Sequence, residues 1–193
     1  MNMKRTRDIR VIRTQTALLE ALEDLIKTKK LSNITITELC TAAKINRNTF
    51  YYHYNNIFEF LDEHKKLIID DLNEIAEISK THNKQNLVEV FTVLKKHPHF
   101  LNILISPNCD LDFFNEIFDV ASSKASIIFS KDPNTITNRE RLLCAYCNAG
   151  CNAVIITWIM NDMKESPEEI ADFIWTSSKN GIFSLLFPNE EFN

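Results

Sequence analysis

Hydrophobic side chains near the start of the chain recur at intervals of three and four residues. The recurrence runs through Ile12, Leu18, Leu19, Leu22, Leu25 and Ile26. Such spacing places apolar groups on one face of an α-helix and polar groups on the other. It predicts a first helix over residues 7–28.

Residues that cap helices mark the next boundary. Thr35-Ile-Thr-Glu38 has the spacing of a capping box, in which the Thr35 side chain accepts a hydrogen bond from the Glu38 backbone and the Glu38 carboxylate accepts one in return. Ile34 and Leu39 are placed to form a hydrophobic staple across this start. Together these features predict a short helix over residues 36–43.

The same kind of signal continues along the chain. Asn46 and Asn55-Asn56 are good helix caps, and Thr137 and Ser166 begin two further capping boxes. The second of these boxes is followed by proline, which is favoured at the first helical position. The helices predicted after residue 43 span 47–52, 57–81, 87–96, 98–105, 112–129, 137–162 and 167–187.

Glycine is scarce: the 193 residues include two, Gly150 and Gly181. Sheet proteins depend on tight turns that favour glycine at positive φ, and phosphate-binding loops need several glycines close together. The composition therefore argues against β-sandwiches and β-barrels and excludes glycine-rich phosphate loops. We expect an all-α protein with about nine helices.

Charge is distributed unevenly along the chain. Residues 1–55 hold ten lysines and arginines against five acidic residues, a net charge of +5, although the whole chain carries −4. A basic N-terminal part on an acidic body predicts a polyanion as the partner of that part. The alternative is a basic surface that serves only solubility.

No apolar run is long enough to span a bilayer, and none follows the basic N-terminus as in a signal peptide. We therefore expect a cytoplasmic protein without a membrane partner, whose five cysteines are reduced.

Residues 36–53 have the spacing of a helix-turn-helix, two short helices joined by a three-residue turn. The second helix of such a motif enters the DNA major groove, and its first side chains face base edges. Here these are Arg47, Asn48 and Thr49. Phe50 is expected in the core, and the ring side chains after it suit phosphate. They are Tyr51, Tyr52 and His53. The alternative is a helical hairpin whose aromatic side chains serve packing.

Residues 13–61 resemble the DNA-binding domain of the TetR family of bacterial transcriptional regulators. The resemblance is carried by the apolar first helix, by Ile34-Thr-Ile-Thr-Glu-Leu39, and most strongly by Thr49-Phe-Tyr-Tyr-His-Tyr54. It extends to Phe60-Leu61.

The resemblance implies a homodimeric, ligand-responsive repressor that binds a near-palindromic operator in double-stranded DNA. Residues 1–55 are expected to form the DNA-binding domain, and residues 56–193 the effector-binding and dimerisation domain. The residues that the resemblance places at DNA are Thr35, Thr37, Arg47, Asn48, Thr49, Tyr51, Tyr52 and His53.

Three positions depart from the family pattern. Ile57 stands where family members usually carry lysine, and Lys30 and Lys44 stand in turns that often hold glycine. A non-glycine residue at positive φ costs about 1–2 kcal/mol, so these turns either avoid that region or tolerate strain. Lys44 and Lys30 are candidates to supply the missing charge at phosphate, and two solvated lysines are the alternative. Ile57 leaves open a second function, a ligand- or protein-binding adaptor or co-activator with weakened DNA binding.

The C-terminal part carries a second resemblance, through Gly150, Trp158 and Met163-Lys-Glu-Ser-Pro-Glu-Glu-Ile170. It is similar to a subset of TetR-like regulators that includes relatives of the dihydroxyacetone kinase operon regulators. This resemblance supports dimerisation through the last two helices, over residues 137–162 and 167–187. A glycine inside a helix costs about 1 kcal/mol relative to alanine, and close helix approach would account for Gly150 and Gly181.

The effector is predicted to be small and apolar, because phenylalanines gather in the region where family members enclose a ligand. The residues predicted to line its site are Phe91, Phe100, Phe114, Phe118 and Trp158. Each of them also suits an ordinary hydrophobic core.

Cysteines recur at helical spacing late in the chain, at Cys144, Cys147 and Cys151. Buried cysteine packs like a small hydrophobic residue, while exposed cysteine would support a third function, a thiol redox-sensing regulator.

His97-Pro-His99 has the residue types of a metal site, which Cys109 or His82 would extend. The proline instead favours a helix corner, and we predict no metal. No nucleophile has a base at a recognisable spacing, so we predict neither an enzyme nor a cofactor.

Overall fold

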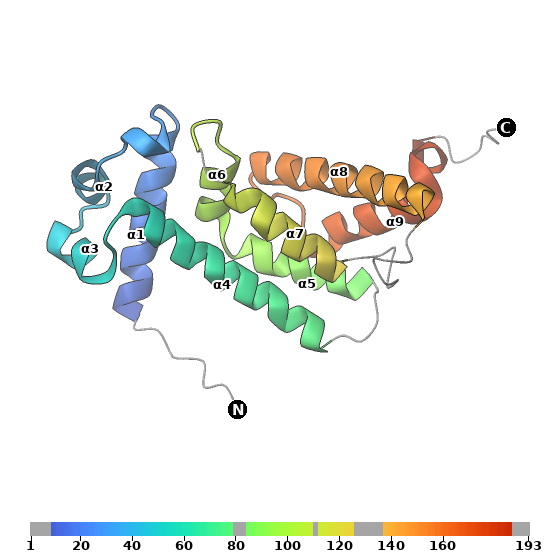
Figure 1. Ribbon diagram of the computed structural model, residues 1–193, viewed down its shortest axis with the longest axis horizontal. Coiled ribbons are helices and arrows are strands. Elements are labelled where there is room, and N and C mark those ends of the chain that lie inside the picture. The colour runs from blue at the N-terminus through green and yellow to red at the C-terminus, as the bar shows by residue number, and fades with distance from the viewer. Residues whose placement is uncertain (1–8, 79–83, 110–111, 126–136, 187–193) are drawn as a thin grey trace. The chain divides into compact units, whose positions relative to one another are not determined.

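The computed structural model describes residues 9–78, 84–109, 112–125 and 137–186, and the regular elements of these residues are all helical (Figure 1). In chain order they are α1 (Ile9–Ile26), η1 (Leu31–Asn33, a 3-10 turn), α2 (Ile36–Ala42), α3 (Arg47–His53), α4 (Ile57–Ile78), α5 (Lys84–Lys95), α6 (Pro98–Ile105), α7 (Phe113–Ala125), α8 (Asn138–Met160) and α9 (Pro167–Leu186). The predicted all-α class is confirmed, and each predicted helix has a counterpart with similar bounds. The ends predicted at residues 7, 81, 129 and 187 lie outside the described residues.

Local capping explains several of these bounds. Thr35 and Glu38 form the predicted capping box, and Ser166 and Glu169 form another at the start of α9. The Asn46 side chain accepts a hydrogen bond from the Asn48 backbone at 2.8 Å and so begins α3. The side chain of Glu140, which the predicted Thr137 box requires, lies outside the described residues.

Contacts between residues divide the chain into two units. The first contains the described residues through Lys66 together with His99–Phe114, and the second contains Leu67–Pro98 together with the described residues from Asn115 onward. The predicted functional division between residues 55 and 56 stays a prediction.

The first unit has a core built by α1, α2, α3 and the first half of α4. Its fully buried side chains include Leu18, Leu22, Ile26, Leu39, Phe50, Phe60 and Leu61. The buried face of α1 begins at Gln15. Ile12 precedes it and is 47% exposed, although its spacing placed it in the apolar stripe.

Helix α6 belongs to this first unit because polar contacts fasten it to α1. The Glu23 carboxylate accepts a hydrogen bond from Asn102 at 2.8 Å and lies 2.6 Å from Nδ1 of His99. Asn108, just after α6, donates to the Ile26 carbonyl at 2.8 Å and accepts from the Leu31 backbone at 3.0 Å.

In the second unit, α5 packs along α9 (Figure 1). Phe91 of α5 meets Trp158 of α8 edge to face, with ring centroids 5.3 Å apart.

Helix α8 ends in a Schellman turn, because Met163 donates to the Trp158 carbonyl and Asp162 to the Ile159 carbonyl. No helix among the described residues has the length and apolar character needed to cross a membrane.

Candidate nucleic-acid interface

Helix α3 is held on the first unit by one buried ring and one buried hydrogen bond. Phe50 is fully buried and contacts the rings of Tyr54 and Phe60, with centroids 5.5 and 6.3 Å away. Gln15 of α1 donates to the Tyr54 hydroxyl at 2.7 Å. The inner face of α3 is therefore fixed, and its outer face is left to solvent.

All nine side chains predicted at DNA are exposed. They are Thr35, Thr37, Lys44, Arg47, Asn48, Thr49, Tyr51, Tyr52 and His53. Two of the three rings are large apolar groups in water, since Tyr51 is 55% and Tyr52 83% exposed. The prediction that aromatic residues here serve packing therefore fits Phe50 and Tyr54 and does not fit these two tyrosines.

The first turn of α3 is joined to α2 by a side-chain contact. Arg47 donates from a guanidinium nitrogen to the Thr37 hydroxyl at 3.3 Å. This contact orients Arg47 at the N-terminal end of the predicted recognition helix, where major-groove readers place the side chains that face bases.

The two lysines in glycine-favouring turns take different conformations. Lys44 has φ 56°, the left-handed region, whereas Lys30 has φ −60° and an extended backbone. In the α2–α3 turn, Lys44 therefore carries the backbone strain that a non-glycine residue has at positive φ. In the turn after α1, Lys30 avoids this strain. The strained position is the one where a lysine is predicted to meet phosphate.

Lys44→Gly is expected to raise the free energy of unfolding by up to about 1 kcal/mol, because glycine adopts positive φ without strain. The same change is expected to reduce the salt dependence of DNA binding by about one unit of slope, through loss of one phosphate contact. Urea unfolding and a salt titration of DNA affinity measure the two effects. Lys30→Gly is the matched control, since its extended backbone offers no strain to relieve; an equal stability gain in both variants would contradict the assignment.

Glu38 is the electrostatic centre of the α2 start. Its carboxylate accepts from Lys29 at 2.7 Å, and from the backbone and hydroxyl of Thr35 at 2.9 and 2.7 Å. The Lys29 hydrogen bond, followed by those from Thr35, lowers the pKa of Glu38 from 4.5 to about 2. Lys29 is thereby engaged within the protein, whereas Lys44 and Arg47, in the turn before α3 and at its first position, are exposed.

Because the folded-state pKa of Glu38 lies below its unfolded value, its stabilising contribution is complete at neutral pH and is lost between about pH 4.5 and pH 2. We expect Glu38→Gln to reduce the fall in urea midpoint between pH 6 and pH 3.5 relative to the unchanged protein, with Glu168→Gln as control. An identical fall in all three proteins would contradict this role.

Ile57 lies in the core at 5% exposure and is not placed to contact DNA. Its burial accounts for the departure from the family pattern as a packing choice. The fourth helix therefore offers no side chain at its first position for a phosphate.

Comparison with known proteins identifies the family of the chain through its C-terminal part. Residues 81–180, more than half of the chain, match the TetR-type family model described as transcriptional regulator C-terminal region. The chain belongs to the TetR family of transcriptional regulators. The resemblance inferred from the helix-turn-helix residues is thus confirmed by a match that lies wholly outside them.

One curated relative is an uncharacterized HTH-type transcriptional regulator of Bacillus subtilis, YxbF, which is 22% identical over 178 residues. The match covers 87% of this chain but 45% of that protein, so this TetR-family chain spans less than half of the relative's length.

Solved structures share the fold. The dihydroxyacetone kinase operon activator DhaS is 21% identical, with a TM-score of 0.51 over 86% of this chain and 94% of that one. The fatty acid degradation regulator FadR of Bacillus halodurans is 14% identical, with a TM-score of 0.55 over 88% and 96%. FadR of Bacillus subtilis, solved with stearoyl-CoA, is 16% identical, with a TM-score of 0.53 over 86% and 98%.

The five residues predicted to line an effector site are spread over both units. Phe100 and Phe114 lie in the first unit, where Phe100 stacks on His64, and Phe91, Phe118 and Trp158 lie in the second. Trp158 alone of the five lines the cavity between α8 and α9. The effector role of all five stays a prediction. The other residues of that cavity were missed, because nothing in their spacing marks them.

The structure describes some of the cysteine and histidine side chains that the sequence singles out. Burial, followed by the neighbouring Cys147, raises the pKa of the Cys151 thiol, which disfavours the reactive thiolate. Cys144 has its side chain outside the described residues. His99 pairs with Glu23 rather than with His97 or Cys109. Within the described ranges, no three His, Cys, Asp or Glu side chains gather as metal ligands, and His82 lies outside them.

Proposed function

We infer that this chain is a ligand-responsive, homodimeric repressor whose two α3 helices read a near-palindromic operator. The observation that carries the proposal is the combination of a buried Phe50 with an outer α3 face of exposed Arg47, Asn48, Thr49, Tyr51 and Tyr52. Arginine pairs with guanine and asparagine with adenine in the major groove, while tyrosine and threonine hydroxyls suit phosphate.

The test is retention of DNA from upstream of the chain's own coding region, measured across a salt series. We expect a specific complex whose affinity falls steeply with salt and exceeds that for scrambled DNA by about a thousandfold or more. Equal affinity for both DNAs would remove the repressor proposal.

The proposed dimer forms through α8 and α9. Leu142 and Tyr146 on α8 are 66% and 67% exposed, and such large apolar side chains on one helix suit a partner surface. At Gly150 on the same helix, an added Cβ would meet no atom of the described residues within 4 Å. Packing against the part of the chain that the structure describes therefore does not require glycine at position 150, and close approach by a second copy would.

Gly150→Leu is expected to weaken the dimer by about tenfold or more through overpacking, while the protomer keeps its fold. Sedimentation velocity at several concentrations measures the change, and circular dichroism checks the helix content. Gly150→Ala is the matched variant, expected to stabilise the helix by about 1 kcal/mol and to perturb the dimer far less. A leucine variant that dimerises as the unchanged protein does would contradict this placement.

The effector is proposed to be small and apolar, and to favour a dimer state whose α3 spacing mismatches DNA, which requires different effector affinity in the two states. FadR of Bacillus subtilis, a protein of the same fold, was solved with stearoyl-CoA, and the apolar acyl chain of that ligand supports an effector with an apolar part.

A second candidate function is an adaptor or co-activator on this scaffold. Burial of Ile57 favours it, since one expected phosphate contact is missing, and DhaS, of similar fold, is named as an activator. Capture of a protein partner by a chain that retains no specific DNA would select this function over the repressor.

A further inference from the structure

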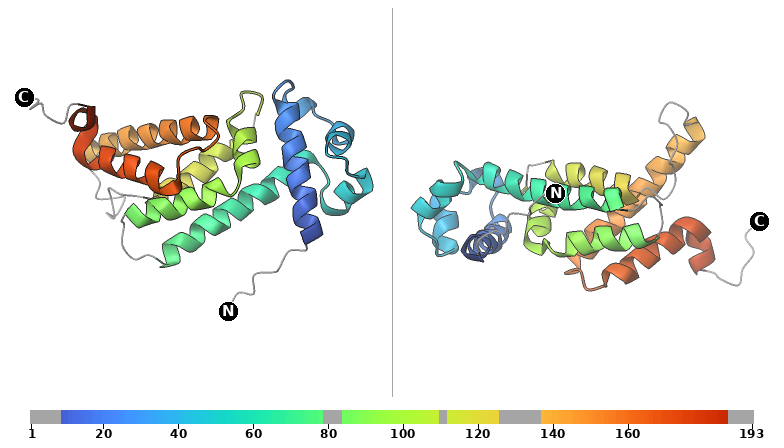
Figure 2. Two further views of the ribbon diagram at one scale, coloured as in Figure 1. Left: turned by 180° about the vertical axis from the view of Figure 1, so that it is seen from behind. Right: turned by 90° about the horizontal axis from the view of Figure 1, so that it is seen from below.

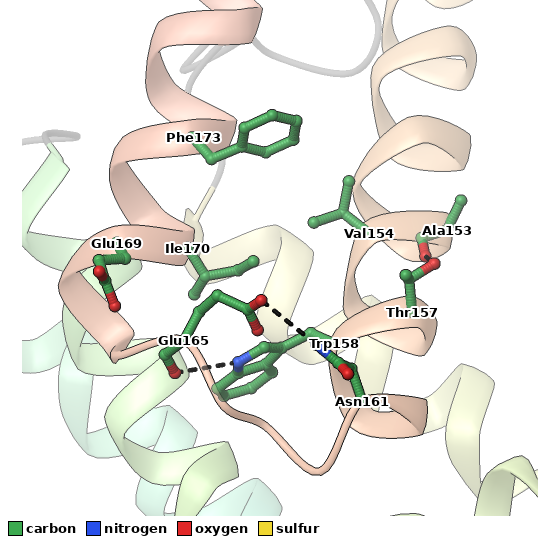
Figure 3. A pocket seen from close by; sticks show the side chains of 9 residues that line it. All are labelled: Ala153, Val154, Thr157, Trp158, Asn161, Glu165, Glu169, Ile170 and Phe173. Atoms are coloured by element: carbon green, nitrogen blue, oxygen red, sulfur yellow. Dashed lines mark hydrogen bonds between the residues drawn. The ribbon is translucent and has the colours of Figure 1, made fainter.

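A cavity of about 460 Å³ lies between α8 and α9, next to the loop that joins them. The right-hand view of Figure 2 shows the two helices diverging from this connection. Figure 3 shows the side chains that surround the space. The size falls in the range of roughly 300–1,000 Å³ that small organic ligands occupy in proteins.

The walls of the cavity are mostly apolar. Val154 and Ala153 face it from α8, Ile170 and Phe173 from α9, and the Trp158 indole closes the end near the loop (Figure 3). Trp158 is rigidly held, because it packs against Phe91 and its indole nitrogen donates to the Glu165 carbonyl at 3.1 Å. Phe173 is 54% exposed and forms the outer wall.

One carboxylate stands inside this apolar frame. The half-buried Glu165 side chain extends into the space between the helices, and its carboxylate accepts a single, long hydrogen bond from Asn161 at 3.3 Å (Figure 3). Two lysines bond close by without pairing with this carboxylate. Lys95 donates to the Glu165 backbone carbonyl at 2.9 Å and lies 6.0 Å from the centroid of the Trp158 ring, and Lys164 donates to the Asn161 side-chain oxygen at 3.2 Å. No ion pair to the Glu165 carboxylate occurs within the described residues.

The charges around the cavity are mixed, because the Lys95 ammonium lies beside Trp158 and helps to lower the pKa of Glu169. Glu169 lines the cavity and accepts from the Ser166 backbone at 2.7 Å, which lowers its pKa and keeps it ionised. The cavity thus combines the Glu165 carboxylate, which makes no ion pair within the described residues, with the capping carboxylate of Glu169 and two aromatic rings. Such an arrangement complements a positive charge on an apolar body, through charge attraction and the faces of the rings.

We propose that the α8–α9 cavity binds a small organic cation with an apolar body, such as an aromatic or branched alkyl amine. Glu165 faces the cationic group, and Phe173, Ile170 and Val154 enclose the apolar part. This site shares Trp158 with the predicted apolar effector site but none of its phenylalanines, and the proposal does not depend on DNA binding.

The test is calorimetric titration of the full chain with benzyltrimethylammonium, its uncharged isostere neopentylbenzene, and phenylacetate. We expect one cation per chain, bound about tenfold or more tightly than either comparison compound, since contacts with charged groups exceed neutral ones in strength. Quenching of tryptophan fluorescence, recorded in Trp175→Phe, reports occupancy beside Trp158.

Glu165→Gln keeps the acceptor for Asn161 and removes the charge, so it is expected to weaken the cation about tenfold or more. Glu168→Gln, an exposed neighbour outside the cavity with the same change in net charge, is expected to leave the affinity unchanged. Phe173→Ala is expected to weaken the cation and the neutral isostere alike. Equal binding of cation and isostere, equal effects of the two glutamine variants, or no cation binding because a second copy fills the cavity would each overturn the proposal.

Discussion

Phe50→Ala is expected to lower the free energy of unfolding of the first unit by about 3–5 kcal/mol, the cost of removing a fully buried phenylalanine side chain. Phe50 is 0% exposed and packs against Tyr54 and Phe60, so its loss leaves a cavity under α3. Since small domains have a free energy of unfolding of about 5–15 kcal/mol in total, this loss is a large fraction of the stability of the unit.

The matched control is Tyr52→Ala on the opposite face of α3. Tyr52 is 83% exposed, and truncation of such a side chain changes stability by about 0.5 kcal/mol or less. We expect Tyr52→Ala to keep the urea midpoint and to lose DNA affinity, whereas Phe50→Ala loses both. If the two variants unfolded at the same urea concentration, the assignment of inner and outer faces would be wrong.

Arg47→Ala is expected to lower affinity for the specific operator by about 1–3 kcal/mol and to relax its sequence preference at one base pair. Arg47 is exposed at the first turn of α3 and is oriented by the Thr37 hydroxyl at 3.3 Å. The loss should fall mainly on specific DNA, because base contacts carry sequence information and phosphate contacts do not.

Competition between operator and scrambled DNA separates the contribution of base contacts to affinity from that of phosphate contacts. Arg139→Ala, an exposed arginine at the start of α8 with the same change in charge, is the control and should leave both affinities unchanged. An equal loss for Arg47→Ala on both DNAs would show that Arg47 acts on phosphate rather than on a base.

The elements that the sequence predicts best are those whose boundaries are local. The capping boxes at Thr35 and Ser166 are each completed within four residues, so their spacing alone locates the starts of α2 and α9. The sequence also predicted which face of α3 is exposed, because the family resemblance and the expected burial of Phe50 together orient the helix.

Features held by distant contacts were not predictable. The η1 turn after α1 is fixed in part by a hydrogen bond from Leu31 to Asn108, far along the chain. The sequence shows that His97 and His99 are close together along the chain, which made a metal site a possibility to consider. It does not show that His99 contacts Glu23, because Glu23 lies in another helix.

The α8–α9 cavity was not predicted, for a related reason. It depends on a turn in which Asp162 and Met163 both adopt positive φ, at 57° and 49°, and glycine is absent there. This turn directs Glu165 between the helices, and no pattern of apolar spacing records it.

The central claim is that a dimer of this chain reads two half-sites with its α3 helices. Hydroxyl-radical footprinting on DNA from upstream of the coding region tests it most directly. We predict two protected segments with near-palindromic sequence, separated by a whole number of helical turns of about 10–10.5 base pairs each. Protection of a single asymmetric segment, or of no segment beyond that seen with competitor DNA, would contradict the account.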